Sequence, residues 1–142
     1  MKKVFSILMV AMFATAMFSC SKDAEDLIIG TWEETEATYN QTINGEAQDP
    51  ISMLEPGETV TITFKDDHTF TSVYHSNEGD GEEDGGSWSV DADKLTMTDG
   101  FGTMTYHIDN IDKKSMTLTY SESGEEDGQT YTTTIVMKMK RV

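Results

Sequence analysis

Hydrophobic and polar residues alternate along most of the chain, a pattern that is typical of β-strands with one buried face. In residues 59–64, for example, Val60, Ile62 and Phe64 fall on one face. The same alternation recurs in residues 69–76, 87–90, 94–98, 102–109, 115–120 and 129–140. Short turn-forming segments lie between these stretches, so the pattern predicts antiparallel hairpins that follow one another along the chain.

One further strand is expected at residues 27–40, which begin Leu-Ile-Ile-Gly-Thr-Trp. Residues 41–58 contain Asn44-Gly45 and Pro56-Gly57 and are expected to form a loop, with a short helix at 51–54. The count is then eight strands. Eight antiparallel strands that each have one dry face predict an all-β, up-and-down barrel, and a β-sandwich is the competing arrangement.

The first nineteen residues follow a different pattern. Lys2 and Lys3 precede an uncharged apolar run at 4–18, which is too short for a transmembrane helix and typical of a signal peptide. Ser19 and Cys20, the one cysteine of the chain, resemble the bacterial lipobox, where the precursor is cut and the cysteine is acylated. We therefore expect a lipoprotein signal peptide at 1–19 and lipidation of Cys20. The alternative is a plain signal or anchor helix with an incidental cysteine.

Residues 20–26 are mostly polar and acidic, and we expect them to tether a domain at 27–142 to a membrane. This segment also resembles the acidic export signal of surface lipoproteins, and a plain flexible linker is the alternative. The expected location is the outer membrane, on its periplasmic or cell-surface face. Several acyl chains on one cysteine give lasting attachment, whereas one chain gives transient binding.

Charge limits the partners of the mature chain. Without Lys2 and Lys3, 8 basic residues stand against 26 acidic residues, a net charge of −18. Such a domain repels phosphate backbones, which argues against nucleic-acid binding. The single cysteine also excludes an intramolecular disulfide.

Four segments resemble the lipocalin-like lipoproteins of Bacteroidota. Residues 27–32 resemble the Gly-x-Trp start of these domains, and 62–71 resemble their second hairpin. Residues 86–95 resemble a Gly-x-Trp, turn, Leu segment, and 131–142 resemble the closing strand. The resemblance covers nearly the whole mature chain and implies a lipocalin-like barrel. It also implies that Gly30, Trp32 and a basic residue of the last strand, Arg141 or Lys140, close one end of that barrel.

The aromatic and methionine content of the inward positions favours a cavity for a small hydrophobic ligand inside the barrel. The residues expected to face such a cavity are mostly aromatic residues and methionines, which adapt to varied apolar surfaces: Phe70, Tyr74, Trp88, Met97, Met104, Tyr106, Met116, Tyr120, Tyr131 and Met137. Alternatively, these side chains fill the barrel, and the protein is an accessory module that contacts or inhibits another protein. An internal cavity of roughly 300 Å³ or more favours the first interpretation.

The chain contains no motif for catalysis or for a cofactor. No Gly-x-Ser-x-Gly turn and no phosphate-binding loop occurs, so we expect neither an enzyme nor a bound cofactor. His68 is expected in a turn, and His75 and His107 on outward strand positions without the spacing of a zinc site.

Two acidic segments have the same sequence, Gly-Glu-Glu-Asp-Gly, at 81–85 and 124–128. We expect them in solvated hairpin loops at 77–86 and 121–128. Asp80, Glu82 and Asp84 partly fit the spacing of a calcium loop and are a weak candidate for a metal site. No helices flank this segment, and its twelfth position is Asp91 rather than a bidentate Glu.

Overall fold

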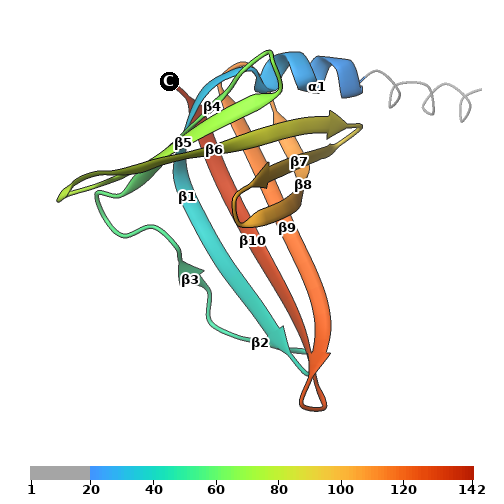
Figure 1. The fold of residues 1–142 in the computed structure, drawn as a ribbon. Coiled ribbons are helices and arrows are strands. Elements are labelled where there is room, and N and C mark those ends of the chain that lie inside the picture. The colour runs from blue at the N-terminus through green and yellow to red at the C-terminus, as the bar shows by residue number, and fades with distance from the viewer. Residues whose placement is uncertain (1–19) are drawn as a thin grey trace, which may run out of the picture.

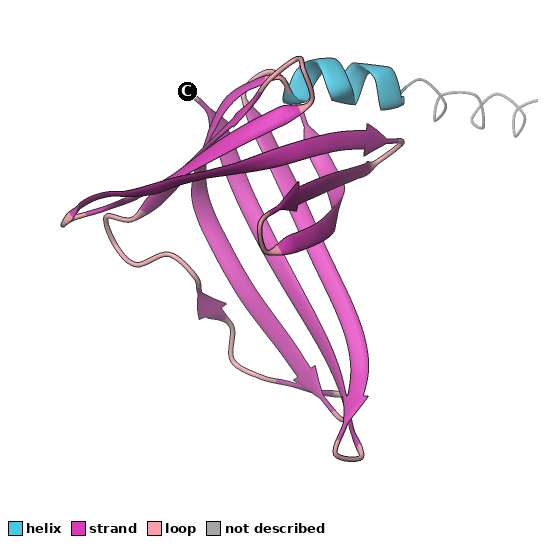
Figure 2. Ribbon diagram, in the orientation of Figure 1, coloured by secondary structure: helices cyan, strands magenta, loops and turns pink. Residues whose placement is uncertain are grey.

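The computed structural model describes residues 20–142, and the predicted signal peptide at 1–19 lies outside the described residues. The described chain is almost entirely β-structure (Figures 1 and 2). Its elements are α1 (Cys20–Ile28), β1 (Gly30–Ile43), β2 (Glu46–Ala47), β3 (Ile51–Ser52), β4 (Thr59–Phe64), β5 (Thr69–Ser76), β6 (Gly79–Asp91), β7 (Lys94–Asp99), β8 (Gly102–Ile111), β9 (Ser115–Glu126) and β10 (Gln129–Arg141).

Strands β1 and β4 to β10 close an antiparallel barrel. From β4 to β10 each strand pairs with the next one in the chain, and β1 pairs with both β4 and β10. The two short strands β2 and β3 pair with the outer half of β1. The predicted eight-stranded up-and-down barrel is therefore confirmed. A β-sandwich is wrong because the β1–β10 ladder joins the edges of what would be separate sheets.

The two ends of the barrel differ. Helix α1 lies over one end, which we call the closed end, together with the β4–β5, β6–β7 and β8–β9 turns (Figure 1). The other end, the open end, carries the β5–β6, β7–β8 and β9–β10 turns. There β1, β9 and β10 extend past the other strands as a projecting sheet, made of residues 39–43, 120–126 and 129–135 (Figure 1).

The best-packed part of the core lies toward the closed end. Trp32 and Ile28 are fully buried, and the indole N–H of Trp32 donates to the carbonyl of Ile28 over 2.8 Å. The ring of Trp88 meets that of Phe64 edge to face at 5.6 Å between centroids. Leu95 is also fully buried. Edge-to-face aromatic pairs add to the hydrophobic stabilisation of such a core.

The expected tether is instead a helix. Ala24 and Ile28 are buried against the barrel, and α1 contacts β6 and β8. Their spacing of four residues places both on one face of the helix. The first strand consequently begins at Gly30 rather than at residue 27 and runs to Ile43. The short helix expected at 51–54 is also wrong, because Ile51 and Ser52 form β3 against β1.

The two acidic segments are strands rather than loops. In β6, Glu83 pairs with Val73, and the glycines at 85 and 86 lie where strands approach closely. A Cβ atom on Gly86 would stand 1.8 Å from the carbonyl oxygen of Thr98. Strand β9 likewise continues to Glu126 and leaves a two-residue turn before β10. Gly85 and Gly86 thus permit close backbone contact, whereas Gly128 lies in the turn between β9 and β10.

A register shift divides β1 into two halves. It lies between Glu34 and Glu36 in the pairing with β10. Trp32 and Glu34 are buried before the shift, and Ala37 is buried after it. The inward positions are therefore even-numbered before the shift and odd-numbered after it, which is the effect of a β-bulge on the alternation of a strand.

Candidate functional site

Three residues that the resemblance implied meet at the closed end. The guanidinium carbon of Arg141 lies 4.3 Å from the centre of the Trp32 ring. Arg141 also donates hydrogen bonds to the carbonyls of Ile29 and Lys113, each over 2.9 Å, and to that of Leu27. Gly30 has a φ of 136°, and a Cβ there would stand 2.2 Å from the Arg141 Nη1 atom. Glycine is thus required for the arginine to reach these carbonyls.

A cavity of about 330 Å³ lies inside the barrel toward its open end. Its walls come from the inner faces of β1, β4, β5, β7, β8, β9 and β10, and its mouth lies at the β7–β8 turn. Phe101 in that turn is 93% exposed. The lining is mostly apolar: Glu34, Val60, Ile62, Phe70, Ser72, Met97, Asp99, Phe101, Gly102, Thr103, Met104, Tyr106, Leu118 and Met137.

Five of the ten expected cavity residues line this space, namely Phe70, Met97, Met104, Tyr106 and Met137. The other five expected residues do not line the cavity, and the structure places them in other parts of the barrel.

Trp88 and Met116 are buried in the packed core instead. The Trp88 indole N–H is shared between the carbonyls of Lys65 and Thr69, at 3.1 Å each, which fixes it beside the β4–β5 turn. Toward the open end, Tyr120 lies behind Tyr106 with 6.1 Å between ring centroids. Tyr120 donates to Glu122 over 2.8 Å.

Tyr74 is 40% exposed, and a hydrogen bond to the Glu58 carboxylate raises its pKa to about 12. Tyr131 lies on the projecting sheet, across from Gly124 of β9. It lines a second, shallower hollow of about 410 Å³ there, together with Tyr39 and three acidic residues. This hollow is mainly polar, so it does not extend the apolar cavity.

Nine of the fourteen lining residues were not among the expected cavity residues, and Glu34 is the buried ionisable one among them. Its exposed fraction is 6%, and among the described residues it is the one ionisable side chain that is buried. Burial raises the pKa of its carboxyl group from the ordinary 4.5 to about 7, and no hydrogen bond or nearby cation opposes that effect. The alternation of the strand did indicate an inward position for Glu34, because Glu34 stands two residues after Trp32 and so shares its face.

Tyr106 and Asp99 complete the polar part of the cavity. Burial raises the pKa of the Tyr106 hydroxyl, and the negative charges of Glu34 and Asp99 raise it further. The hydroxyl points to the Met104 sulfur at 3.5 Å. Polar groups of the cavity are thus acidic or hydroxylic, and its lining contains no Lys, Arg or His.

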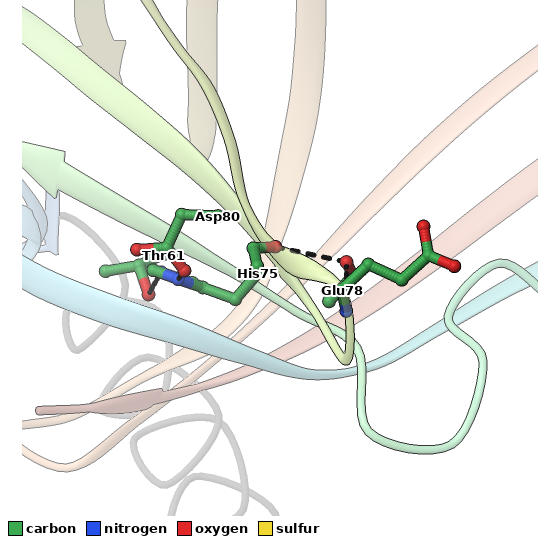
Figure 3. A network of polar contacts seen from close by, with 6 residues as sticks. Thr61, His75, Glu78 and Asp80 are labelled. Atoms are coloured by element: carbon green, nitrogen blue, oxygen red, sulfur yellow. Dashed lines mark hydrogen bonds and ion pairs between the residues drawn. The ribbon is translucent and has the colours of Figure 1, made fainter.

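A polar network on the outer face resembles an arrangement used in nucleophilic catalysis (Figure 3). The two ring nitrogens of His75 face Asp80 at 2.7 Å and the Thr61 hydroxyl at 3.0 Å. The order of groups matches a hydroxyl, base and acid triad. However, β4 is paired on both sides at Thr61, so its backbone amides are not free to stabilise an oxyanion. The network instead joins three neighbouring strands.

Two of the three candidate calcium ligands, Asp80 and Asp84, are engaged by different neighbours. Asp80 is engaged by His75, and Asp84 accepts a hydrogen bond from the Gly85 amide over 2.7 Å. Both lie on β6, where a separation of four residues corresponds to roughly 13 Å. Within residues 20–142, no group of three metal-binding side chains comes together. His107 is half exposed between Asp93 and Asp109, and His68 lies near Glu25 at the closed end.

Comparisons with known proteins agree with this architecture. The family model of the lipocalin-like domain matches residues 28–137. The fold is similar to that of a lipocalin-like protein from Bacteroides uniformis, with a TM-score of 0.54 and 11% identity over 82% of this chain and 99% of that one. An uncharacterized protein from Bacteroides eggerthii aligns at a TM-score of 0.48 and 14% identity, over 80% and 98% of the two chains. No curated protein matches the chain. Among the described helices, none is sufficiently long and apolar to span a bilayer.

Proposed function

Since this chain belongs to the lipocalin-like domain family, we propose that it is a lipid-anchored binding protein that holds a small, mostly apolar molecule inside its barrel. The observation that carries the proposal is the cavity of about 330 Å³ at the open end. Small-molecule sites begin at roughly 300 Å³. A barrel filled by its own side chains would leave no such space, so the cavity favours a binding protein over an accessory interaction module.

The lining of the cavity suits a compact ligand. Met97, Met104 and Met137 contribute flexible, polarisable walls that adjust to different apolar shapes. Phe101 stands exposed at the mouth, where it can cover a bound molecule. A cavity near the lower limit of ligand sites favours a molecule much smaller than a long-chain lipid.

The position of Cys20 supports an orientation on the membrane. Cys20 begins α1, which lies over the closed end (Figure 1). A lipid on this residue would hold the closed end toward an outer-membrane leaflet and direct the mouth away from it. Labelling of the full chain with an alkyne fatty acid in a Bacteroidota host tests the anchor. We expect label on the protein and none on Cys20→Ser; equal labelling of both would contradict it.

Binding itself is tested with N-phenyl-1-naphthylamine, a neutral probe that fluoresces in apolar surroundings. Residues 20–142 contain the entire barrel and its covering helix, and this segment is used without lipid under reducing conditions. We expect saturable fluorescence at one site. Ser72→Phe places a ring in the cavity and should abolish the signal, whereas Ser89→Phe, on the exposed outer face of β6, should not. Absence of saturable binding, or equal binding by both variants, would overturn the proposal.

A further inference from the structure

We infer, on the basis of the proposed binding function, that the cavity selects a small apolar amine, with its ammonium group at Glu34 and its apolar body against Met97 and Met137. The cavity presents one buried carboxyl group to its occupant and surrounds it with apolar side chains. The Glu34 carboxylate has no cationic partner in the cavity, and a ligand with an ammonium group would supply one.

Among the described residues, none supplies that cation. Lys138 and Lys140, the basic residues of β10 nearest in sequence to the cavity-lining Met137, form ion pairs with Glu36 and Glu33 on the outer face, at 3.2 and 2.9 Å. Arg141 is engaged at the closed end. A buried carboxylate without a cation or donor is costly, and a partner that brings both a charge and N–H donors removes the cost.

The distribution of charge between the two ends of the barrel also favours a cationic ligand. The open-end segments 41–58, 74–84, 98–104 and 120–132 contain four, five, one and four acidic residues and no Lys or Arg. The basic residues of the described chain lie in α1, in the closed-end turns and in the last four residues of β10: Lys22, Lys65, Lys94, Lys113, Lys114, Lys138, Lys140 and Arg141. A rim of one sign attracts ligands of the opposite sign and raises their association rate.

The same features oppose the binding of a fatty acid. Its carboxylate would lie in an apolar space beside Glu34, with Asp99 at the rim and no lysine or arginine to receive it. Like charges in a desolvated site repel strongly, which gives discrimination as well as affinity. A neutral alcohol would fit the same walls but could offer Glu34 one hydrogen bond without a charge.

Glu34 faces few other titratable groups. Tyr106 on β8, Asp99 at the end of β7 and Tyr120 on β9 are the ionisable residues around this part of the barrel. The residues that β4, β5 and β10 contribute to the lining are apolar or hydroxylic. An alkylammonium group keeps its charge up to about pH 10. Amine binding should therefore weaken as the pH falls from 8 to 5 and Glu34 takes up a proton in the free protein.

The test uses three competitors of one chain length against the bound N-phenyl-1-naphthylamine: hexylamine, hexanol and hexanoate. At pH 8 we expect hexylamine to displace the probe at a concentration at least about tenfold lower than hexanol, and hexanoate to be the weakest. Glu34→Gln keeps the shape and removes the charge, so it should abolish the preference for the amine and leave hexanol unchanged. Glu36→Gln, on the outer face of the same strand, is the matched control and should behave as the unmodified protein.

The outcomes separate the two proposals. Equal displacement by all three compounds, or an amine preference that survives Glu34→Gln, would overturn the inference and leave the binding function standing. Failure of the probe to bind at all would overturn both. An amine preference that is lost in Glu34→Gln and at pH 5, but kept in Glu36→Gln, supports the inference.

Discussion

The closed and open ends of this barrel are built from the same strands but satisfy their polar groups in opposite ways. At the closed end, Arg141 donates to three carbonyls and lies over the Trp32 ring, whose own N–H is also bonded. At the open end, Glu34 is buried with no cation or donor to oppose the effect of desolvation. The difference indicates that polar groups stabilise the fold at the closed end, whereas the open end contains a buried carboxyl group to which we assign the proposed ligand.

Loss of the Trp32 side chain should have the largest effect on stability. Trp32→Ala removes a fully buried ring, and with it the contact to Arg141 and the hydrogen bond to Ile28. We expect a loss of about 3–5 kcal/mol in the free energy of unfolding. Urea denaturation followed by far-UV circular dichroism measures it.

The open-end counterpart of this change is Phe101→Ala. Phe101 is 93% exposed, so we expect the free energy of unfolding to change by less than about 0.5 kcal/mol. A loss comparable to that of Trp32→Ala would mean that the open end contributes to stability as much as the closed end, and the contrast between the ends would fail.

Glu34→Gln should raise the free energy of unfolding at pH 8, by slightly less than Trp32→Ala lowers it. The raised pKa means that the folded chain retains a proton that the unfolded chain has lost between pH 4.5 and about 7. Stability therefore falls as the pH rises through this interval. The penalty is about 3 kcal/mol above pH 7 and vanishes below pH 4. Gln carries no such penalty, so we expect the variant to be more stable than the unmodified protein at pH 8 and equal to it at pH 4.

Paired denaturation curves of the two proteins at pH 4 and pH 8 provide the measurement. A variant that is less stable at pH 8 would show that Glu34 already has a partner in the folded chain. The open end would then be complete without a ligand.

The barrel could be predicted from sequence because alternation is strong where one face is dry, as in β4 with Val60, Ile62 and Phe64. The acidic part of β6 could not, because Glu83 and Asp84 have low strand propensity. Their strand is instead held by backbone pairing with Val73 and Ser72. Helix α1 was missed because five polar residues in its nine positions hid the spacing of Ala24 and Ile28.

The candidate site was predictable only in part, since alternation gives the face of a residue but not its height in the barrel. Met97 and Trp88 both point inward and are paired with each other across β6 and β7, yet Met97 lines the cavity and Trp88 does not. Tyr131 is likewise on an inner face but beyond the barrel, on the projecting sheet. Strand length and the length of each turn set these heights, and neither is marked by a motif.

The register shift in β1 also has a consequence for how relatives of this protein can diverge. Residues before the shift, such as Trp32 and Glu34, keep their orientation whatever happens after it. Deletion of Thr35 would restore the simple alternation and leave Ala37 and Tyr39 opposite Met137 and Ile135, on the same inner face as before. The partners on β10 thus set the inner face on both sides of the shift, so a loss of one residue at this point would alter the local twist of β1 and keep both sets of inner side chains in place.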